Sequence, residues 1–183
     1  MKTSIVCLFV SGLFLSVCSA QAAETKTIRA ELQVPATRKP APVFQLDNAS
    51  GSKISNADFL GHVVLLDFWA TECGGCRLEI PSFIGLQNVY RGQGLKAVGI
   101  SMDIAYENLK SAKEAWARVN PFVREQGVNY PILMADPVVE KAYNVVGLPA
   151  TYLIDKSGRI AAVYVGVVDK DDIEANIKRL LRE

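Results

Sequence analysis

Two cysteines three positions apart, Cys73 and Cys76, constrain the fold of this 183-residue chain more than any other feature. They follow an apolar run over residues 62–68, which predicts a buried strand, and precede residues 77–90, where apolar positions recur at helical spacing. The pair therefore lies on the first turn of a helix, where unpaired N–H groups and the helix dipole stabilise a thiolate. This placement predicts a disulfide that opens and closes without unfolding the chain.

The pattern of the remaining chain predicts alternating strands and helices. Strands are predicted over residues 43–46, 53–55, 95–101, 131–134, 150–154 and 160–165, and helices over residues 105–126, 137–143 and 170–181. We expect Asn120-Pro121 to divide the first of these helices in two. Strand–helix–strand followed by a strand hairpin and a helix predicts an α/β fold, with a mixed central sheet flanked by helices.

The residues around the cysteines resemble a known family. Asp67-Phe68-Trp69-Ala70, Pro81 and the later stretch 147–155 resemble thioredoxin. The opening residues 41–46 and the long insert before Pro149 resemble the TlpA/ResA branch of extracytoplasmic thiol–disulfide oxidoreductases. The resemblance implies a thioredoxin fold with an N-terminal β-hairpin extension and a central helical insert.

The resemblance covers about residues 40–183, and the sequence departs from the family pattern at two places. Glu72 stands where the family usually has an aromatic residue. The dipeptide between the cysteines is Gly74-Gly75, without the usual proline. Both departures bear on the chemistry of the cysteine pair.

Residues 1–22 have the features of a secretory signal peptide. Lys2 precedes an apolar stretch too short to span a bilayer, and Ala20-Gln21-Ala22 fits the small-residue rule for cleavage. A buried N-terminal helix is one alternative. Lipidation at Cys18 is another, although the valine before this cysteine fits a lipobox poorly. The signal predicts a periplasmic or otherwise extracytoplasmic protein.

Cleavage after Ala22 divides the chain into a linker over residues 23–40 and a thioredoxin-like domain over residues 41–183. We expect the polar linker to be a loosely packed arm. Cys73 and Cys76 are then the only cysteines left, so the pair is a working disulfide and not a structural one. The 20 basic and 19 acidic residues nearly balance, and no basic patch predicts nucleic-acid binding.

Three residues are expected to carry the redox reaction. Cys73, at the start of the helix, should be exposed and act as nucleophile, and Cys76 should attack the resulting mixed disulfide. Asp67 is a carboxylate in an apolar strand, so burial should raise its pKa. The resemblance implies that Asp67 accepts the proton of Cys76. An edge position that reaches water is the alternative for this side chain.

The resemblance assigns the substrate contacts to two segments. It implies that Pro149 is cis and packs across from the cysteines, which leaves the backbone of Leu148 free to pair with an extended substrate strand. Trp69 would flank the cysteines as an apolar surface for the substrate, and a purely packing role is its alternative.

Glu72 bears on the direction of electron flow. A carboxylate next to Cys73 disfavours the thiolate and so favours a reductant. We therefore expect a thiol:disulfide reductase of oxidised substrate proteins, re-reduced by a membrane electron-donor thiol protein. The resemblance implies cytochrome c maturation as the process that this reductase serves. No cofactor is expected.

Two other functions compete with this interpretation. A thiol peroxidase needs a proline and a threonine at spacings before the cysteine that Thr71 does not satisfy. A metal- or haem-handling module would need further ligands, and the only histidine is His62. The sequence predicts neither a metal site nor a membrane span in the domain.

Overall fold

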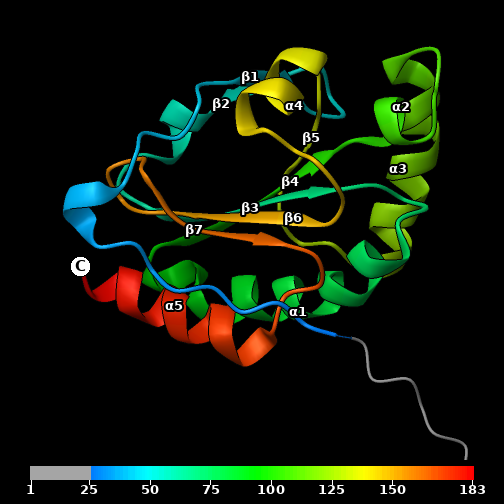
Figure 1. The fold of residues 1–183 in the computed structure, drawn as a ribbon. Helices are drawn as coiled ribbons and strands as arrows, with labels where there is room; N and C mark the ends of the chain where they lie inside the picture. The colour runs from blue at the N-terminus through cyan, green and yellow to red at the C-terminus, as the bar shows by residue number, and fades with distance from the viewer. Residues whose placement is uncertain (1–25) are drawn as a thin grey trace, which may run out of the picture.

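The central sheet contains five strands in the order β5-β4-β3-β6-β7 (Figure 1). The computed structural model describes residues 26–183, so the predicted signal peptide and Cys18 lie outside the described residues. The strands are β3 (Val63–Trp69), β4 (Leu95–Ser101), β5 (Ile132–Met134), β6 (Ala150–Ile154) and β7 (Ile160–Val165). Strand β3 is parallel to β4 and antiparallel to β6, which confirms the mixed sheet.

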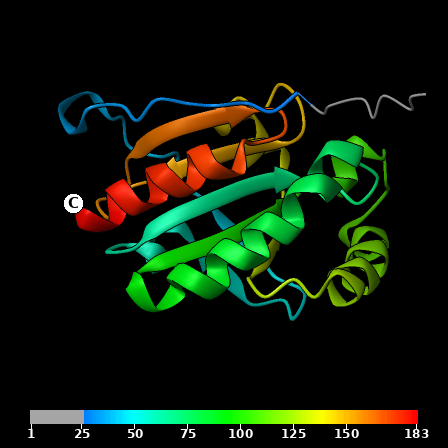
Figure 2. The same cartoon turned by 90° about the horizontal axis from the view of Figure 1, so that it is seen from below.

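Helices cover both faces of this sheet (Figures 1 and 2). One face carries α1 (Gly74–Tyr90), α3 (Ala112–Gln126) and α5 (Lys170–Arg182). The other carries α4 (Pro137–Tyr143) and the hairpin of β1 (Gln45–Asp47) and β2 (Lys53–Ser55). Short helical turns are η1 (Pro35–Thr37), η2 (Asn56–Phe59), η3 (Arg91–Gln93) and α2 (Asp103–Tyr106). Within residues 26–183, no helix is long and apolar enough to cross a membrane.

All seven residues of β3 are buried, because both faces of the central strand are covered. Val63, Leu65 and Trp69 belong to the core beneath α1, α3 and α5. The alternate residues Leu66 and Phe68 belong to the core beneath α4 and the hairpin. The run in the sequence is therefore almost continuously apolar because this strand lies between two cores.

The helical insert divides at a different place from the one predicted. Helix α3 continues through Pro121, and the break lies between α2 and α3. There Asn108 adopts a left-handed conformation (φ 53°), and the Ser111 side chain caps α3 by accepting a hydrogen bond from the Glu114 amide. Pro121 removes one helical hydrogen bond, but the buried Phe122 next to it packs in the core and holds the helix together.

The segment before the hairpin is not loosely packed. Residues 28–40, which we call the N-terminal arm, lie along the outer edge of β7 (Figure 2). Backbone hydrogen bonds join Ile28 to Val167, Gln33 to Ala161 and Lys39 to Ile160. The prediction of a loose linker is therefore wrong for the arm, because the edge strand supplies backbone partners that composition does not reveal.

Arg38 fastens the arm to the domain. Its side chain is only 2% exposed, and it forms ion pairs with Asp155 at 3.0 Å and with Glu183 at 2.6 Å. Its Nε atom also donates to the Gln33 carbonyl oxygen at 3.0 Å. This one guanidinium joins the arm, the β6–β7 turn and the end of α5.

Replacing Arg38 with alanine should lower the free energy of unfolding by about 2–4 kcal/mol, because the buried Asp155 loses its charged partner. Urea denaturation with the disulfide intact measures this. The matched control is Lys53→Ala, which breaks an exposed ion pair with Asp47 and should change stability by less than about 1 kcal/mol. Equal effects in the two variants would contradict the anchoring role of Arg38.

Candidate active site

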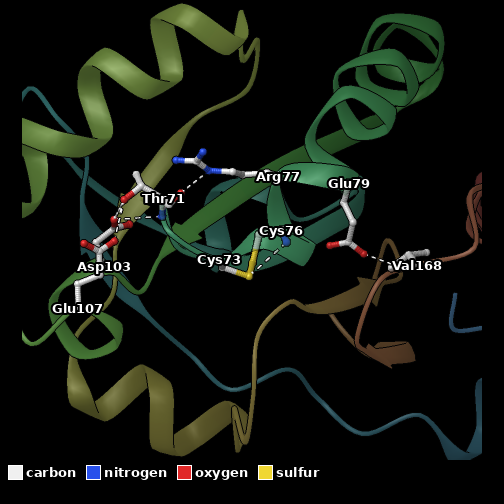
Figure 3. Close-up of a disulfide and its surroundings, with 8 residues drawn as sticks. All are labelled: Thr71, Cys73, Cys76, Arg77, Glu79, Asp103, Glu107 and Val168. Atoms are coloured by element: carbon white, nitrogen blue, oxygen red, sulfur yellow. Dashed lines mark hydrogen bonds between the residues drawn. A yellow bond between two sulfur atoms is a disulfide. The ribbon is translucent and has the colours of Figure 1, made fainter. Parts of the chain in front are cut away.

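The cysteine pair forms a disulfide at the start of α1 (Figure 3). Cys73 is the N-cap residue of α1 and Cys76 lies in its first turn, with Cα atoms 5.3 Å apart. The Cys73 Sγ atom accepts a hydrogen bond from the Cys76 amide at 3.2 Å. The predicted position of the pair is confirmed, and one sulfur faces an N–H group that helix geometry leaves unpaired.

Both sulfurs are less accessible than the sequence suggested. Cys73 is 3% exposed and Cys76 is fully buried. The expected exposure of Cys73 is therefore wrong for the disulfide form, because its side chain turns inward to bond Cys76. Its neighbours Glu72 and Gly74 are exposed, so the Cys73 sulfur lies just beneath the surface.

Pro149 packs against the first turn of α1. The Leu148–Pro149 peptide bond is cis, as the resemblance implied. A Cβ atom on Gly75 would lie 3.1 Å from Pro149 Cδ and 3.2 Å from Val167 Cγ2, which is closer than ordinary van der Waals contact. Glycine at position 75 thus lets the helix backbone approach the proline. Leu148 is half-buried beside it, and with Tyr106 it lines a shallow groove.

Trp69 does not offer a surface to a substrate. Its side chain is 1% exposed, and its ring stacks on Phe122 with the centroids 5.3 Å apart. A Cβ atom on Gly99 would lie 2.8 Å from the indole Nε1, so the neighbouring strand needs a glycine there to accommodate the ring. The substrate-contact prediction is wrong for this structure, and the packing alternative describes the indole.

Asp67 is buried beneath α1. It is 1% exposed and lies on the same face of β3 as Trp69, directly opposite Thr151 of β6. Neither carboxylate oxygen has a hydrogen-bond partner among the described residues. Burial raises the pKa of the Asp67 carboxyl well above its usual range. The structure therefore confirms a buried carboxyl and excludes the edge position in water.

Glu79 is a second buried carboxyl, and the sequence analysis missed it. It is 3% exposed, and its Oε1 atom accepts a hydrogen bond from the Val168 amide at 2.5 Å (Figure 3). Burial, and secondly the charge of Asp67, raise the pKa of Glu79. The available signal was its position three residues after Cys76, on the same face of the helix.

Glu72 points away from the buried site. Its side chain is 64% exposed, and a carboxylate oxygen lies 3.5 Å from an Arg77 guanidinium nitrogen. Arg77 also donates from Nε to the Thr71 carbonyl oxygen at 2.6 Å. The negative charge beside Cys73 is thus partly balanced by a nearby positive one.

Comparisons with known proteins agree with this geometry. The family model described as AhpC/TSA family matches residues 37–163. Thioredoxin-like protein YneN of Bacillus subtilis is 35% identical over 137 residues, which cover 75% of this chain and 76% of YneN. Thiol-disulfide oxidoreductase ResA of Geobacillus kaustophilus is 31% identical over 141 residues, which cover 76% of this chain and 75% of ResA.

Solved structures show the same fold. A putative thiol:disulfide interchange protein DsbE from Chlorobium tepidum superposes with a TM-score of 0.67 and 26% identity, over 85% of this chain and 99% of that one. A secreted thiol-disulfide isomerase from Corynebacterium glutamicum superposes with a TM-score of 0.71 and 24% identity, over 89% of this chain and 96% of that one. These likenesses confirm the thioredoxin fold.

The two buried carboxyls should make stability depend on pH. A carboxyl whose pKa is raised by folding stabilises the fold below its unfolded pKa of about 4, and this stability is lost as the pH rises through the folded pKa. The free energy of unfolding of the wild-type protein should therefore fall between about pH 5 and pH 8. In Asp67→Asn and in Glu79→Gln, this fall should be smaller by about 1 kcal/mol or more.

Urea denaturation of the oxidised protein at the two pH values measures this loss. The control is Glu125→Gln, which replaces an exposed carboxyl of α3 and should leave the pH dependence unchanged. If Asp67→Asn keeps the wild-type pH dependence, Asp67 is not held neutral by the fold. The two effects should not add, because the carboxyls interact.

Proposed function

Because the chain belongs to the AhpC/TSA family and is a ResA-like thiol–disulfide oxidoreductase, we propose that it acts outside the cytoplasm as a reductant of disulfides in partner proteins. The observation that carries this proposal is the Cys73–Cys76 disulfide at the start of α1. The predicted signal peptide supports the location.

The reaction consists of two exchanges. In the reduced protein, the Cys73 thiolate attacks one sulfur of a substrate disulfide, forms a mixed disulfide and releases the other substrate sulfur as a thiolate. Cys76 then loses its proton and attacks Cys73 Sγ. This step forms the Cys73–Cys76 disulfide and releases the second substrate thiolate. Two electrons pass from the protein to the substrate.

Of the two buried carboxyls, Asp67 accepts the proton that Cys76 loses, whereas Glu79, whose pKa is raised to about 9, keeps its own proton at neutral pH. Asp67 lies on the strand face that α1 covers, and Glu79 lies one helical turn beyond Cys76. A carboxylate whose pKa is raised toward neutrality is a competent base at neutral pH. The proton stays inside the domain while the mixed disulfide resolves, so the step does not need bulk water at the buried sulfur.

An extended substrate segment binds beside Pro149. The backbone of Leu148 pairs with this segment, and the groove that Leu148 and Tyr106 line receives a neighbouring apolar side chain. In an oxidising compartment the protein must be re-reduced, and a membrane thiol protein supplies these electrons. Maturation of apocytochrome c is the destination that the family resemblance favours.

Trapping tests the roles of the two cysteines. A Cys76→Ser variant should accumulate mixed disulfides with partner proteins, because the resolving thiol is absent while Cys73 still attacks. Cys73→Ser is the matched control and should accumulate severalfold fewer adducts. Mass spectrometry of the adducts identifies the partners. Adducts that form mainly in Cys73→Ser would reverse the assigned roles.

A peroxide assay separates this function from a thiol peroxidase. With dithiothreitol as electron donor, the wild-type protein should reduce a protein disulfide and should not accelerate peroxide consumption above the rate of dithiothreitol alone. Rapid peroxide consumption that is lost in Cys73→Ser would overturn the reductase proposal.

Glu72 favours the reducing direction by disfavouring the Cys73 thiolate. Glu72→Gln should stabilise the thiolate and therefore the reduced form, which makes the reduction potential less negative. Exposure and the nearby Arg77 limit the change to about 10–30 mV. Equilibration with glutathione measures it, and Glu125→Gln is the control. An unchanged or more negative potential would exclude this role.

A further inference from the structure

A buried hydroxyl group lies between two carboxyls next to the cysteine loop. Thr71 Oγ1 is 2.5 Å from an oxygen of Asp103 and 2.8 Å from an oxygen of Glu107 (Figure 3). Asp103 is fully buried, and it also accepts hydrogen bonds from the Thr71 amide at 3.1 Å and from the Ser101 hydroxyl at 2.8 Å. The reaction described above does not use these groups.

The hydrogen-bond distances around Thr71 Oγ1 require that one of the two carboxyls carries a proton. A threonine hydroxyl carries one hydrogen and can donate to only one acceptor. If Asp103 and Glu107 were both ionised, one of their oxygens would face a lone pair of Thr71 Oγ1 at hydrogen-bond distance. One carboxyl must therefore be protonated and must donate to Thr71.

The surroundings identify the protonated group as Asp103. Glu107 forms an ion pair with Arg118 of α3, which stabilises its charged form, whereas Asp103 has no cationic partner among the described residues. Burial raises the pKa of Asp103. The pKa of Glu107 is lowered, because the hydrogen bond from Thr71 and the charge of Arg118 outweigh its burial.

We propose that Asp103 is a positioning residue for the nucleophile: Asp103 and Glu107 have one carboxyl proton between them, it lies on Asp103, and the hydrogen bonds from Asp103 to Thr71 and from Thr71 to Glu107 fix the loop from which Cys73 and α1 begin. The inference deepens the proposed function and rests on it. Asp103 donates to Thr71 Oγ1, and Thr71 donates to Glu107. Loss of the proton leaves two carboxylates against one hydroxyl and adds a negative charge beside the loop.

Other charged groups also face this loop. Arg118 packs from α3, Arg77 of α1 holds the Thr71 carbonyl oxygen, and Glu72 lies within the loop and pairs with Arg77. An arginine side chain does not lose its proton in proteins. We therefore assign the titration to Asp103, and the Glu72→Gln variant removes the other carboxyl that faces the loop.

The matched variants Thr71→Val and Thr71→Ser test the direction of the hydrogen bonds. If protonated Asp103 donates to Thr71, removing the hydroxyl destabilises the protonated form, so Thr71→Val lowers the pKa of Asp103 and Thr71→Ser restores it. If Thr71 instead donates to an ionised Asp103, Thr71→Val raises this pKa. Carboxyl-carbon NMR titration of the oxidised protein measures the shift, and a rise in Thr71→Val overturns the proposal.

A second measurement tests the effect on the nucleophile. In the reduced protein, the alkylation rate of Cys73 should rise with pH as its thiol ionises. Once Asp103 loses its proton, this rate should be about threefold lower than the curve for ionisation of a single thiol predicts. This deviation should persist in Glu72→Gln and disappear in Asp103→Asn, whose amide donates to Thr71 without titrating. A deviation that persists in Asp103→Asn overturns the positioning role. The NMR measurement needs no substrate, so a failure of the proposed reductase function is distinguishable from a failure of the proton assignment to Asp103.

Discussion

The burial of β3 on both faces is the constraint on which the rest of the structure depends. A strand between two cores is apolar at nearly every position, and β3 ends where the sheet ends. The chain then turns directly into α1, so the cysteines lie where a central strand meets the start of a helix. The same burial shields the Asp67 carboxyl from solvent, which makes Asp67 chemically different from the other residues of this strand.

Buried acid groups lie on both sides of the disulfide in the view of Figure 3. Glu79 lies on one side and interacts with Asp67, which accepts the proton of Cys76 in the proposed reaction. Asp103 lies on the other side and holds the loop through Thr71. In the proposed reaction, Asp67 and Glu79 act on the resolving cysteine, and Asp103 acts on the segment that carries the nucleophile. One set of buried acid groups thus serves proton transfer, and the other serves positioning of the loop.

The sequence predicts most of the fold, because strand and helix periods are local properties. The strands over 95–101, 150–154 and 160–165 and the helix over 137–143 have the predicted bounds. Side-chain environments depend on contacts between distant segments, and there the burial of Asp67 is confirmed while other side chains were predicted wrongly or missed. Examples are the buried ring of Trp69, the closed position of Cys73 and the carboxyl of Glu79 under Val168.

The same reason explains two errors in the chain path. Pro121 is an ordinary signal for a helix boundary, yet its neighbours Val119 and Phe122 pack in the core and keep α3 continuous. The arm over residues 28–40 is polar, yet the backbone of β7 binds it. An open outer strand is a template onto which a second chain can add, and repeated addition polymerises a protein through its sheet. The arm hydrogen-bonds to Ile160 and Ala161 at one end of β7 and to Val167 just beyond the other end, so a partner chain that pairs along the whole of β7 must first displace it. The arm therefore opposes the pairing of two copies of this chain along β7.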